Sequence, residues 1–157
     1  MTVAERVRAF LAAGPFAVVG ASPDRAKFGN RVLRKYVEHD LPVRPVNPRG
    51  GEIERLPAAR SLTELCELWA RPGAVSIITP PAVTEEVVQE ALELGIEHLW
   101  MQPGAESEHA VQLAEAGGAS VLWGGPCRLV ELEPPTAGRQ VRRSRRSQPP
   151  TRRRRRA

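Results

Sequence analysis

A short glycine-containing turn near the start of the chain has the composition of an anion-binding site. Gly20, Ala21 and Ser22 follow the apolar run 16–19, and Lys27 comes five residues after Ser22. Glycine lets a ligand approach the backbone closely, and free N–H groups at the start of a following helix attract phosphate. We therefore predict that this turn, with the Ser22 hydroxyl and the Lys27 charge, binds an anionic cofactor.

Polar and small residues also follow the later apolar segments, at 47–49, 79–81, 102–104 and 124–127. Each group has a plain structural alternative, because glycine turns, solvated turns and prolines at helix starts are common without any ligand. Their recurrence at equivalent places favours one shared site. Beyond the first turn, the predicted cofactor-binding residues are Asn47, Pro48, Arg49, Thr79, Pro80, Pro81, Gln102 and Gly104.

The residues after the second apolar segment discriminate between nucleotide cofactors. The sequence lacks the full G-x-G-x-x-G fingerprint, and no carboxylate follows Val46 to hold the adenine ribose 2′-hydroxyl of NAD. Arg49 stands in that region instead, and its charge matches an additional phosphate on the ribose. The sequence therefore favours coenzyme A, or NADP(H) in an oxidoreductase, over NAD.

Strand-like and helix-like patterns alternate along the chain, which is typical of a parallel α/β fold. Strand-like apolar runs cover 16–19, 43–46, 74–78, 98–101 and 120–123. Apolar residues at helical spacing cover about 27–39 and 83–94, and they also occur in the segments that begin after Thr2, Ser61 and Ser107. Two prolines in and before 43–46 favour an edge position for that strand. We predict an α/β, Rossmann-like three-layer fold with a mainly parallel five-stranded sheet over residues 1–132. Its ligand would bind beyond the carboxyl ends of the strands.

Several of these segments together resemble the CoA-binding domain family, which includes small standalone bacterial proteins and the α subunit of succinyl-CoA synthetase. The segments that carry the resemblance are 17–22, 46–48, 78–81 and 99–105. The resemblance implies a pyrophosphate at 20–22, the 3′-phospho-ADP end of the cofactor near 47–49, and pantetheine passing 79–81 toward 102–104. The chain departs from the standalone members near Cys127, because Gly124, Gly125 and Pro126 precede it where those members carry Asp-Arg-Cys.

The sequence contains no Ser-His-Asp pattern, metal-ligand cluster or P-loop, so we expect binding of CoA or acyl-CoA without catalysis. The protein would act as a sensor, a carrier or a subunit serving a separate acyl-CoA enzyme. His98 is expected to be a packing or exposed residue, and nothing near His109 marks it as a base. Cys127 is expected to be inert and buried, with disulfide exchange with the pantetheine thiol as the alternative.

The chain consists of an acidic segment and a strongly basic segment, and the basic one begins at Glu133. Residues 1–132 contain 13 basic and 17 acidic residues, whereas 133–157 contain ten arginines and one glutamate. The second segment lacks hydrophobic periodicity, so we predict a disordered tail. It either binds nucleic acid weakly through phosphates or is a solvated extension. Two distant cysteines and the absence of a leader or long apolar run favour a cytoplasmic protein with reduced thiols and no membrane association.

Removal of residues 133–157 should test the nucleic-acid alternative. Because arginines bind phosphates through charge, retention of the full chain on immobilised single-stranded DNA should fall steeply with added salt. Retention of the truncated chain should be lost at every salt concentration. Equal retention of the two chains in a salt-gradient elution would exclude the tail as the binding segment.

Overall fold

The computed structural model describes residues 2–124, which form a three-layer α/β structure around a parallel sheet. The sheet contains β1 (Phe16–Val19), β2 (Val43–Val46), β5 (Ala74–Ile77), β6 (His98–Met101) and β7 (Ser120–Leu122). Its spatial order is β2-β1-β5-β6-β7, and all neighbouring strands are parallel. The predicted Rossmann-like fold is confirmed, and β2 with its prolines lies at an edge of this sheet, as expected.

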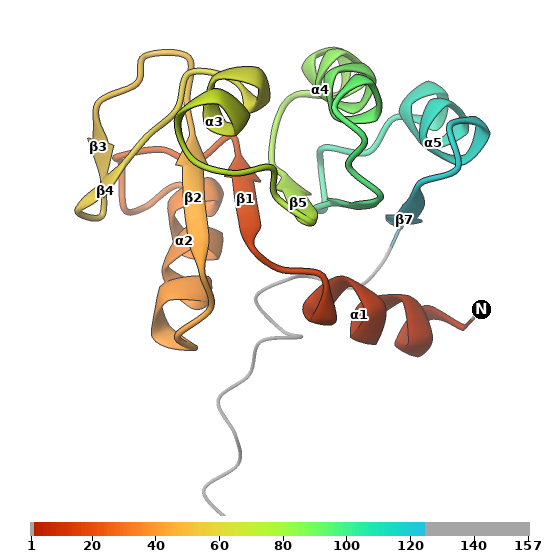
Figure 1. Ribbon diagram of the computed structural model, residues 1–157, viewed down its shortest axis with the longest axis horizontal. Coiled ribbons are helices and arrows are strands. Elements are labelled where there is room, and N and C mark those ends of the chain that lie inside the picture. Colours follow the sequence, from red (N-terminus) through yellow and green to blue (C-terminus); the bar gives the residue numbers. More distant parts are fainter. Residues whose placement is uncertain (1, 125–157) are drawn as a thin grey trace, which may run out of the picture.

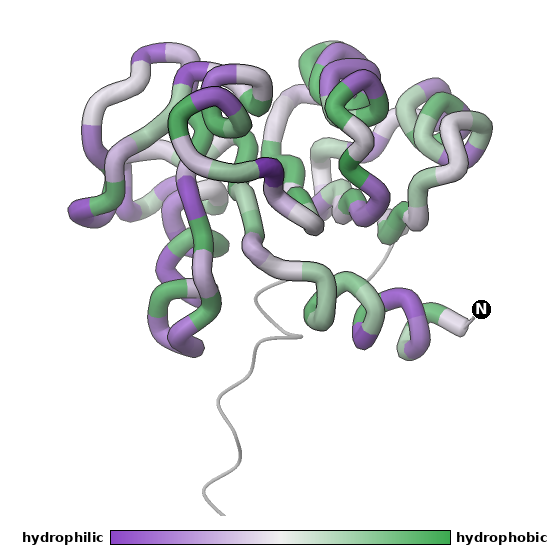
Figure 2. The backbone as a smooth tube through the Cα atoms, in the orientation of Figure 1, coloured by the Kyte–Doolittle hydropathy of each residue, from purple (hydrophilic) through white to green (hydrophobic). Residues whose placement is uncertain are grey.

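Helices cover both faces of the sheet (Figure 1). One face is covered by α1 (Val3–Ala12) and α2 (Phe28–Glu38), and the other by α3 (Leu62–Leu68), α4 (Pro81–Glu93) and α5 (Glu108–Ala116). Because successive strand residues point to opposite faces, Phe16 and Val18 join one core and Ala17 and Val19 the other. In Figure 2 the helices alternate between hydrophobic and hydrophilic residues along their turns, as expected when one side is buried.

Most of the aromatic residues collect in the core beneath α1 and α2. The ring of Phe10 meets that of Trp100 edge to face at 5.2 Å, and Phe16 lies 5.0 Å from Tyr36 between ring centroids. The Tyr36 hydroxyl lies 2.6 Å from the Ser76 hydroxyl, and both residues are fully buried. This hydrogen bond links α2 to the central strand β5.

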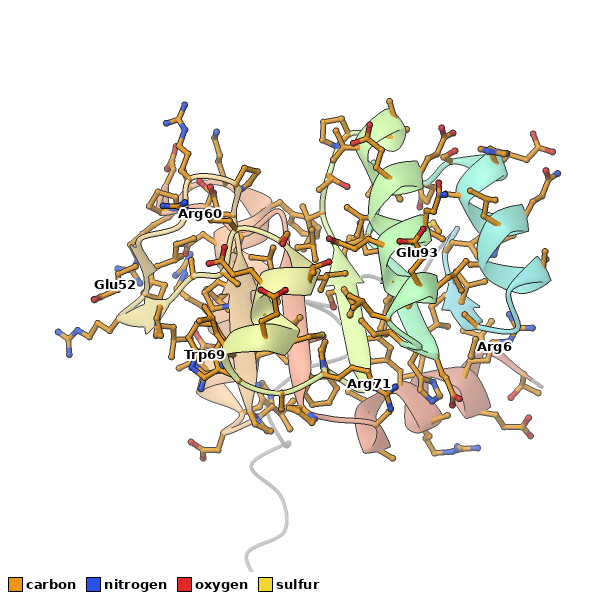
Figure 3. All side chains as sticks on the ribbon, turned by 45° about the horizontal axis from the view of Figure 1, so that its top comes forward. Arg6, Glu52, Arg60, Trp69, Arg71 and Glu93 are labelled. Atoms are coloured by element: carbon orange, nitrogen blue, oxygen red, sulfur yellow. The ribbon has the colours of Figure 1, made fainter. Side chains whose placement is uncertain are left out.

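The starts of α1, α3 and α5 follow the capping signals of the sequence. Thr2 and Glu5 form a complete capping box at α1, and the Ser107 hydroxyl accepts the Ala110 N–H at the start of α5. The Ser61 hydroxyl likewise accepts the Glu64 N–H at α3. At the outer edge of the sheet, Arg6 of α1 donates to the Val121 carbonyl at 3.1 Å, and Figure 3 shows Arg6 on that side of α1.

A short hairpin between β2 and α3 was not expected from the sequence. It comprises β3 (Glu52–Ile53) and β4 (Leu56–Pro57), which are too short to show periodicity. Its turn places Glu54 and Arg55 at positive φ, a conformation that no local residue preference predicts for this pair. None of the helices within 2–124 has the length and apolar character needed to cross a bilayer. The predicted tail, 133–157, lies outside the described residues.

The buried hydroxyl pair gives a test of core packing. Tyr36→Phe leaves the Ser76 hydroxyl without this partner in the core, so it should lower the free energy of unfolding by about 1–3 kcal/mol. Urea unfolding monitored by circular dichroism measures the loss. Because Tyr36→Phe with Ser76→Ala removes both polar groups, that double variant should lose less than the sum of the single variants. Additive losses would contradict a direct bond.

Candidate functional site

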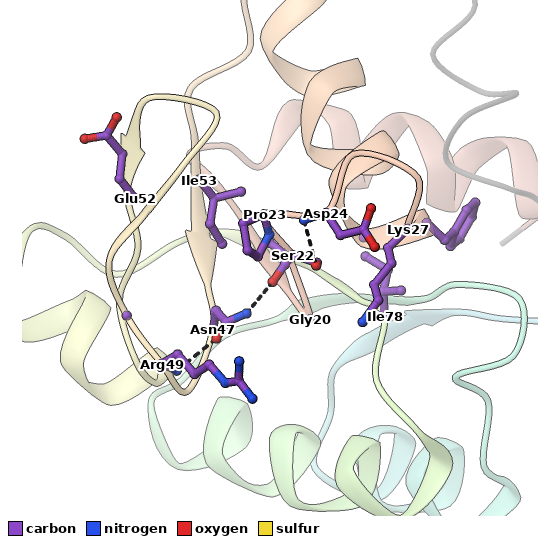
Figure 4. A pocket seen from close by; sticks show the side chains of 14 residues that line it. Gly20, Ser22, Pro23, Asp24, Lys27, Asn47, Arg49, Glu52, Ile53 and Ile78 are labelled. Carbon is purple, nitrogen blue, oxygen red and sulfur yellow. Dashed lines mark hydrogen bonds between the residues drawn. The ribbon is translucent and has the colours of Figure 1, made fainter.

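A large cavity lies at the point where the strand order of the parallel sheet reverses. From β1 the chain crosses to β2 on one side and later returns to β5 on the other, which makes the gap between β1 and β5 the topological switch point. Open α/β sheets bind ligands at this place, outside the carboxyl ends of the strands. The cavity has a volume of about 740 Å³. It is lined by Gly20, Ala21, Ser22, Pro23, Asp24, Lys27, Phe28, Gly29, Asn47, Arg49, Gly50, Glu52, Ile53 and Ile78 (Figure 4).

The turn after β1 brings three strands together at the cavity. The Gly20 N–H donates to the Val46 carbonyl at 3.2 Å, and the Ile78 N–H donates to Val19 at 2.8 Å. Gly20 has a φ of +93°, and a Cβ atom there would overlap the Ile78 carbonyl. Glycine is therefore required both for the backbone conformation and for the close packing of β1 against the end of β5.

A second glycine lets the start of α2 approach the same turn. Gly29 is buried in the first turn of α2, and a Cβ atom there would overlap the Gly20 carbonyl. Lys27, the residue that precedes the helix, makes no side-chain hydrogen bond to cap it. The first-turn N–H groups of a helix have no partner within the helix, and its dipole makes this end positive. The main-chain N–H groups at the start of α2 can therefore bind an anion without a side chain in between.

Two cations add to this positive end. Lys27 and Arg49 are both exposed and line the cavity from the loops after β1 and β2. Figure 4 shows their charged ends extending from opposite sides toward the space in front of Gly20, whereas the Glu52 carboxylate points away from it. The side chain of Asp24 is used locally, because its Oδ1 accepts the Ala26 N–H at 3.0 Å.

The side chain of Asn47 is hydrogen-bonded to the backbone around the turn. Its Nδ2 donates to the Ala21 carbonyl at 2.8 Å, and its Oδ1 accepts the Arg49 N–H at 2.9 Å. The Ser22 hydroxyl accepts the Asp24 N–H at 3.1 Å, which leaves its own proton to donate. Asn47 therefore fixes the turn, while Ser22 keeps a donor for a ligand.

Sequence reasoning missed a buried amide that holds the same turn from behind. The fully buried Asn30 donates through Nδ2 to the Ser22 carbonyl at 2.8 Å and to Glu54 of the hairpin at 3.1 Å. Its Oδ1 accepts from Arg34 at 2.9 Å, and Arg25 pairs with Glu54 at 3.2 Å. The available signal was an amide directly after Gly29 at the start of a predicted helix.

The structure brings six of the twelve predicted site residues to this cavity and leaves six outside its lining. Those in the lining are Gly20, Ala21, Ser22, Lys27, Asn47 and Arg49, and those outside are Pro48, Thr79, Pro80, Pro81, Gln102 and Gly104. The second group still lies at carboxyl ends of strands, with Thr79 beside the lining residue Ile78. The Thr79 hydroxyl lies 2.7 Å from the Thr84 hydroxyl at the start of α4, and the Gln102 side chain is fully buried.

The remaining candidates for chemistry lie elsewhere. His98 begins β6 at the amino end of the sheet, away from the cavity, and His109 is exposed on α5. Burial raises the pKa of the Cys66 thiol on α3, which keeps it protonated. Cys127 is outside the described residues. Within 2–124 no group of histidine, cysteine and carboxylate side chains is arranged to hold a metal ion.

Comparison with known proteins now identifies the family. The model of the CoA binding domain family matches residues 15–133, which is most of the chain and includes the whole cavity. This chain belongs to the CoA-binding domain family. The resemblance in the segments around the cavity is therefore confirmed at the level of the family.

Solved structures of similar proteins agree with this membership. A conserved hypothetical protein from Pyrococcus furiosus is 40% identical, with a TM-score of 0.67, over 74% of this chain and 97% of that chain. A protein from Thermus thermophilus is 27% identical, with a TM-score of 0.70, over 83% and 96% of the two chains. A dinucleotide-forming acetyl-coenzyme A synthetase from Ca. Korarchaeum cryptofilum is 25% identical with a TM-score of 0.61; the match covers 73% of this chain but only 26% of the synthetase.

The close packing of the two glycines has a measurable consequence. Alanine in a helix is normally more favourable than glycine by about 1 kcal/mol. Gly29→Ala should nevertheless lower the melting temperature, because the new Cβ atom would overlap the Gly20 carbonyl and push α2 away from the turn. Differential scanning fluorimetry measures the change. Arg31→Ala, at an exposed position of the same helix, is the control, and a Gly29→Ala protein more stable than the parent would contradict the close approach.

Proposed function

We propose that the cavity binds coenzyme A or an acyl-CoA, with the pyrophosphate over residues 20–22 and the start of α2. The observation that carries the proposal is the backbone surface formed by Gly20 and Gly29 at the switch point of a CoA-binding domain. A pyrophosphate needs several donors within a short distance, and two side-chain-free positions let it reach main-chain N–H groups directly. The Ser22 hydroxyl supplies a further donor.

The charges around the cavity support a ligand with several phosphates. Lys27 and Arg49 lie on opposite sides of the turn, and the acidic lining residues Asp24 and Glu52 are respectively bonded to backbone and directed away. Arg49 follows β2, where a carboxylate would be needed for NAD. We assign Arg49 to the 3′-phosphate that distinguishes CoA from its dephospho form. The alternative ligand, NADP(H), carries its additional phosphate at the ribose 2′ position.

The size of the cavity suits the nucleotide part of CoA. Its volume, about 740 Å³, lies within the range of small-molecule sites, whereas the pantetheine arm would extend beyond it. The loops 79–81 and 102–104 follow β5 and β6, the next strands along the sheet. We assign the arm to these loops, in accord with the order of the strands.

The proposed role is that of a CoA-binding sensor, carrier or subunit, with the chemistry performed by a separate acyl-CoA enzyme. In the acetyl-coenzyme A synthetase the similar region is about a quarter of the chain. This fold is thus found as one part of a larger protein, an acetyl-coenzyme A synthetase.

Titration calorimetry with CoA, dephospho-CoA and NADPH tests the ligand and the role of Arg49. CoA should bind most tightly. Arg49→Gln should weaken CoA binding by about 10-fold or more, the usual effect of losing a charge-assisted hydrogen bond, and should leave dephospho-CoA binding nearly unchanged. Arg8→Gln, at an exposed position on α1, removes the same charge away from the cavity. It should change the affinity for neither CoA nor dephospho-CoA.

Two results would contradict the proposal. If NADPH binds and CoA does not, the ligand is a pyridine nucleotide and the protein is an oxidoreductase candidate. If Arg49→Gln weakens CoA and dephospho-CoA equally, Arg49 does not contact the 3′-phosphate.

A further inference from the structure

A second groove lies on the outer side of α5, at the far edge of the sheet from β2. It has a volume of about 450 Å³ and is lined by Glu106, Ser107, Glu108, Val111, Gln112, Glu115 and Trp123. Residues 108, 111, 112 and 115 form one stripe of the helix, and Trp123 comes directly after β7. Trp123 is 48% exposed, unlike the fully buried Trp100. A large aromatic side chain left open in a groove is suited to a partner surface.

No described element covers this groove. The strand β7 is the last in the sheet, and α5 makes its main contacts with α4 and β7. Both elements form the right-hand side of the molecule in Figure 1. Among the described residues, Glu108, Gln112 and Glu115 on the outer side of α5 are exposed, whereas Val111 is buried in the core at the base of the groove.

The groove is acidic, and so is the half of the domain around it. Glu106, Glu108 and Glu115 form its rim, and residues 72–124 contain eight glutamates with neither lysine nor arginine. The two ion pairs found among the described residues, Arg25–Glu54 and Lys35–Glu38, involve α2 and its neighbouring loops instead. Glu106 accepts N–H groups of Gly104 and Gly124, whereas Glu108 and Glu115 are exposed. Arg6 of α1 lies near Glu115, but it donates to the Val121 carbonyl. None of the three glutamates is in an ion pair among the described residues, so the groove presents net negative charge.

The chain itself supplies a segment with the opposite charge. Residues 133–157 contain ten arginines and one glutamate, and the described chain ends at Gly124, next to Trp123 in the groove. Arginine pairs with carboxylates and also stacks on tryptophan. The protein already contains such a stack, since the Arg44 guanidinium lies 4.0 Å from the centre of the Trp69 ring. We propose that the arginine-rich segment 139–156 of this chain docks in the α5 groove, with guanidinium groups on the glutamate rim and on Trp123.

The tether is long enough for this contact. Fourteen residues separate Gly124 from Arg139, and an extended chain of that length spans up to about 50 Å. The nine residues of α5 extend only about 14 Å. Exposed ion pairs are individually weak and screened by salt, but a tether gives the segment a high effective concentration at the groove, and several arginines can pair at once. Docking also withholds these arginines from polyanions, so the groove competes with any nucleic acid for the segment.

Paramagnetic NMR on the full-length chain tests the docking. A nitroxide is attached at Ser147→Cys, within the arginine-rich segment, after Cys66→Ser and Cys127→Ser remove the other thiols. At low ionic strength the amide signals of 108–115 should be broadened. The broadening should be lost in about 1 M salt, where the Debye length is about 3 Å, and in the Glu108→Gln, Glu115→Gln variant.

Matched controls make each result decisive. Glu67→Gln with Glu97→Gln removes two exposed charges outside the groove and should keep the broadening. Absence of broadening at low salt, or equal loss in both double variants, would overturn the proposal. A mixture of isotope-labelled chain without the nitroxide and unlabelled chain with it should show no broadening. Broadening in the mixture would mean that a second copy supplies the segment, against docking in the same chain.

Discussion

The site depends on one close approach of main-chain atoms. The carbonyl oxygens of Ile78 and Gly20 occupy the space that side chains at Gly20 and Gly29 would need. Three elements from different parts of the chain therefore meet as bare backbone: the end of β1, the end of β5 and the start of α2. This contact sets the path of α2 against the sheet and exposes main-chain donors at the switch point. Other features of the cavity are arranged around it.

Two amide side chains hold that backbone in place, and exposed cations give it charge. Asn47 binds the turn from β2, and the buried Asn30 binds it from α2 while reaching the hairpin through Glu54. A buried amide with its donor and acceptor both used gives a rigid and directional support. Lys27 and Arg49 are exposed at the open side of the cavity. In the proposed site, the residues that hold the turn are therefore different from those that would attract an anionic ligand.

The domain is also divided electrostatically along its sheet. Residues 24–60, which include the loops after β1 and β2, contain nine basic and five acidic residues, whereas 72–124 contain eight glutamates and no lysine or arginine. An anionic ligand is attracted to the first half and repelled by the second, which orients its approach to the cavity. The same division leaves the second half open to a basic partner. A single domain can therefore present one surface that favours anions and another that favours basic partners.

The sequence by itself determined the five strands of the main sheet, the helices and the turn at Gly20, because periodicity, caps and glycine turns act over only a few residues. It also placed the candidate residues at the carboxyl edge, since all the strands are parallel. Only the tertiary structure decided which six of the twelve share the cavity, why Gly29 is needed, and that Asn30 supports the turn. Those features depend on contacts between residues distant in the chain, and no local pattern encodes such distances.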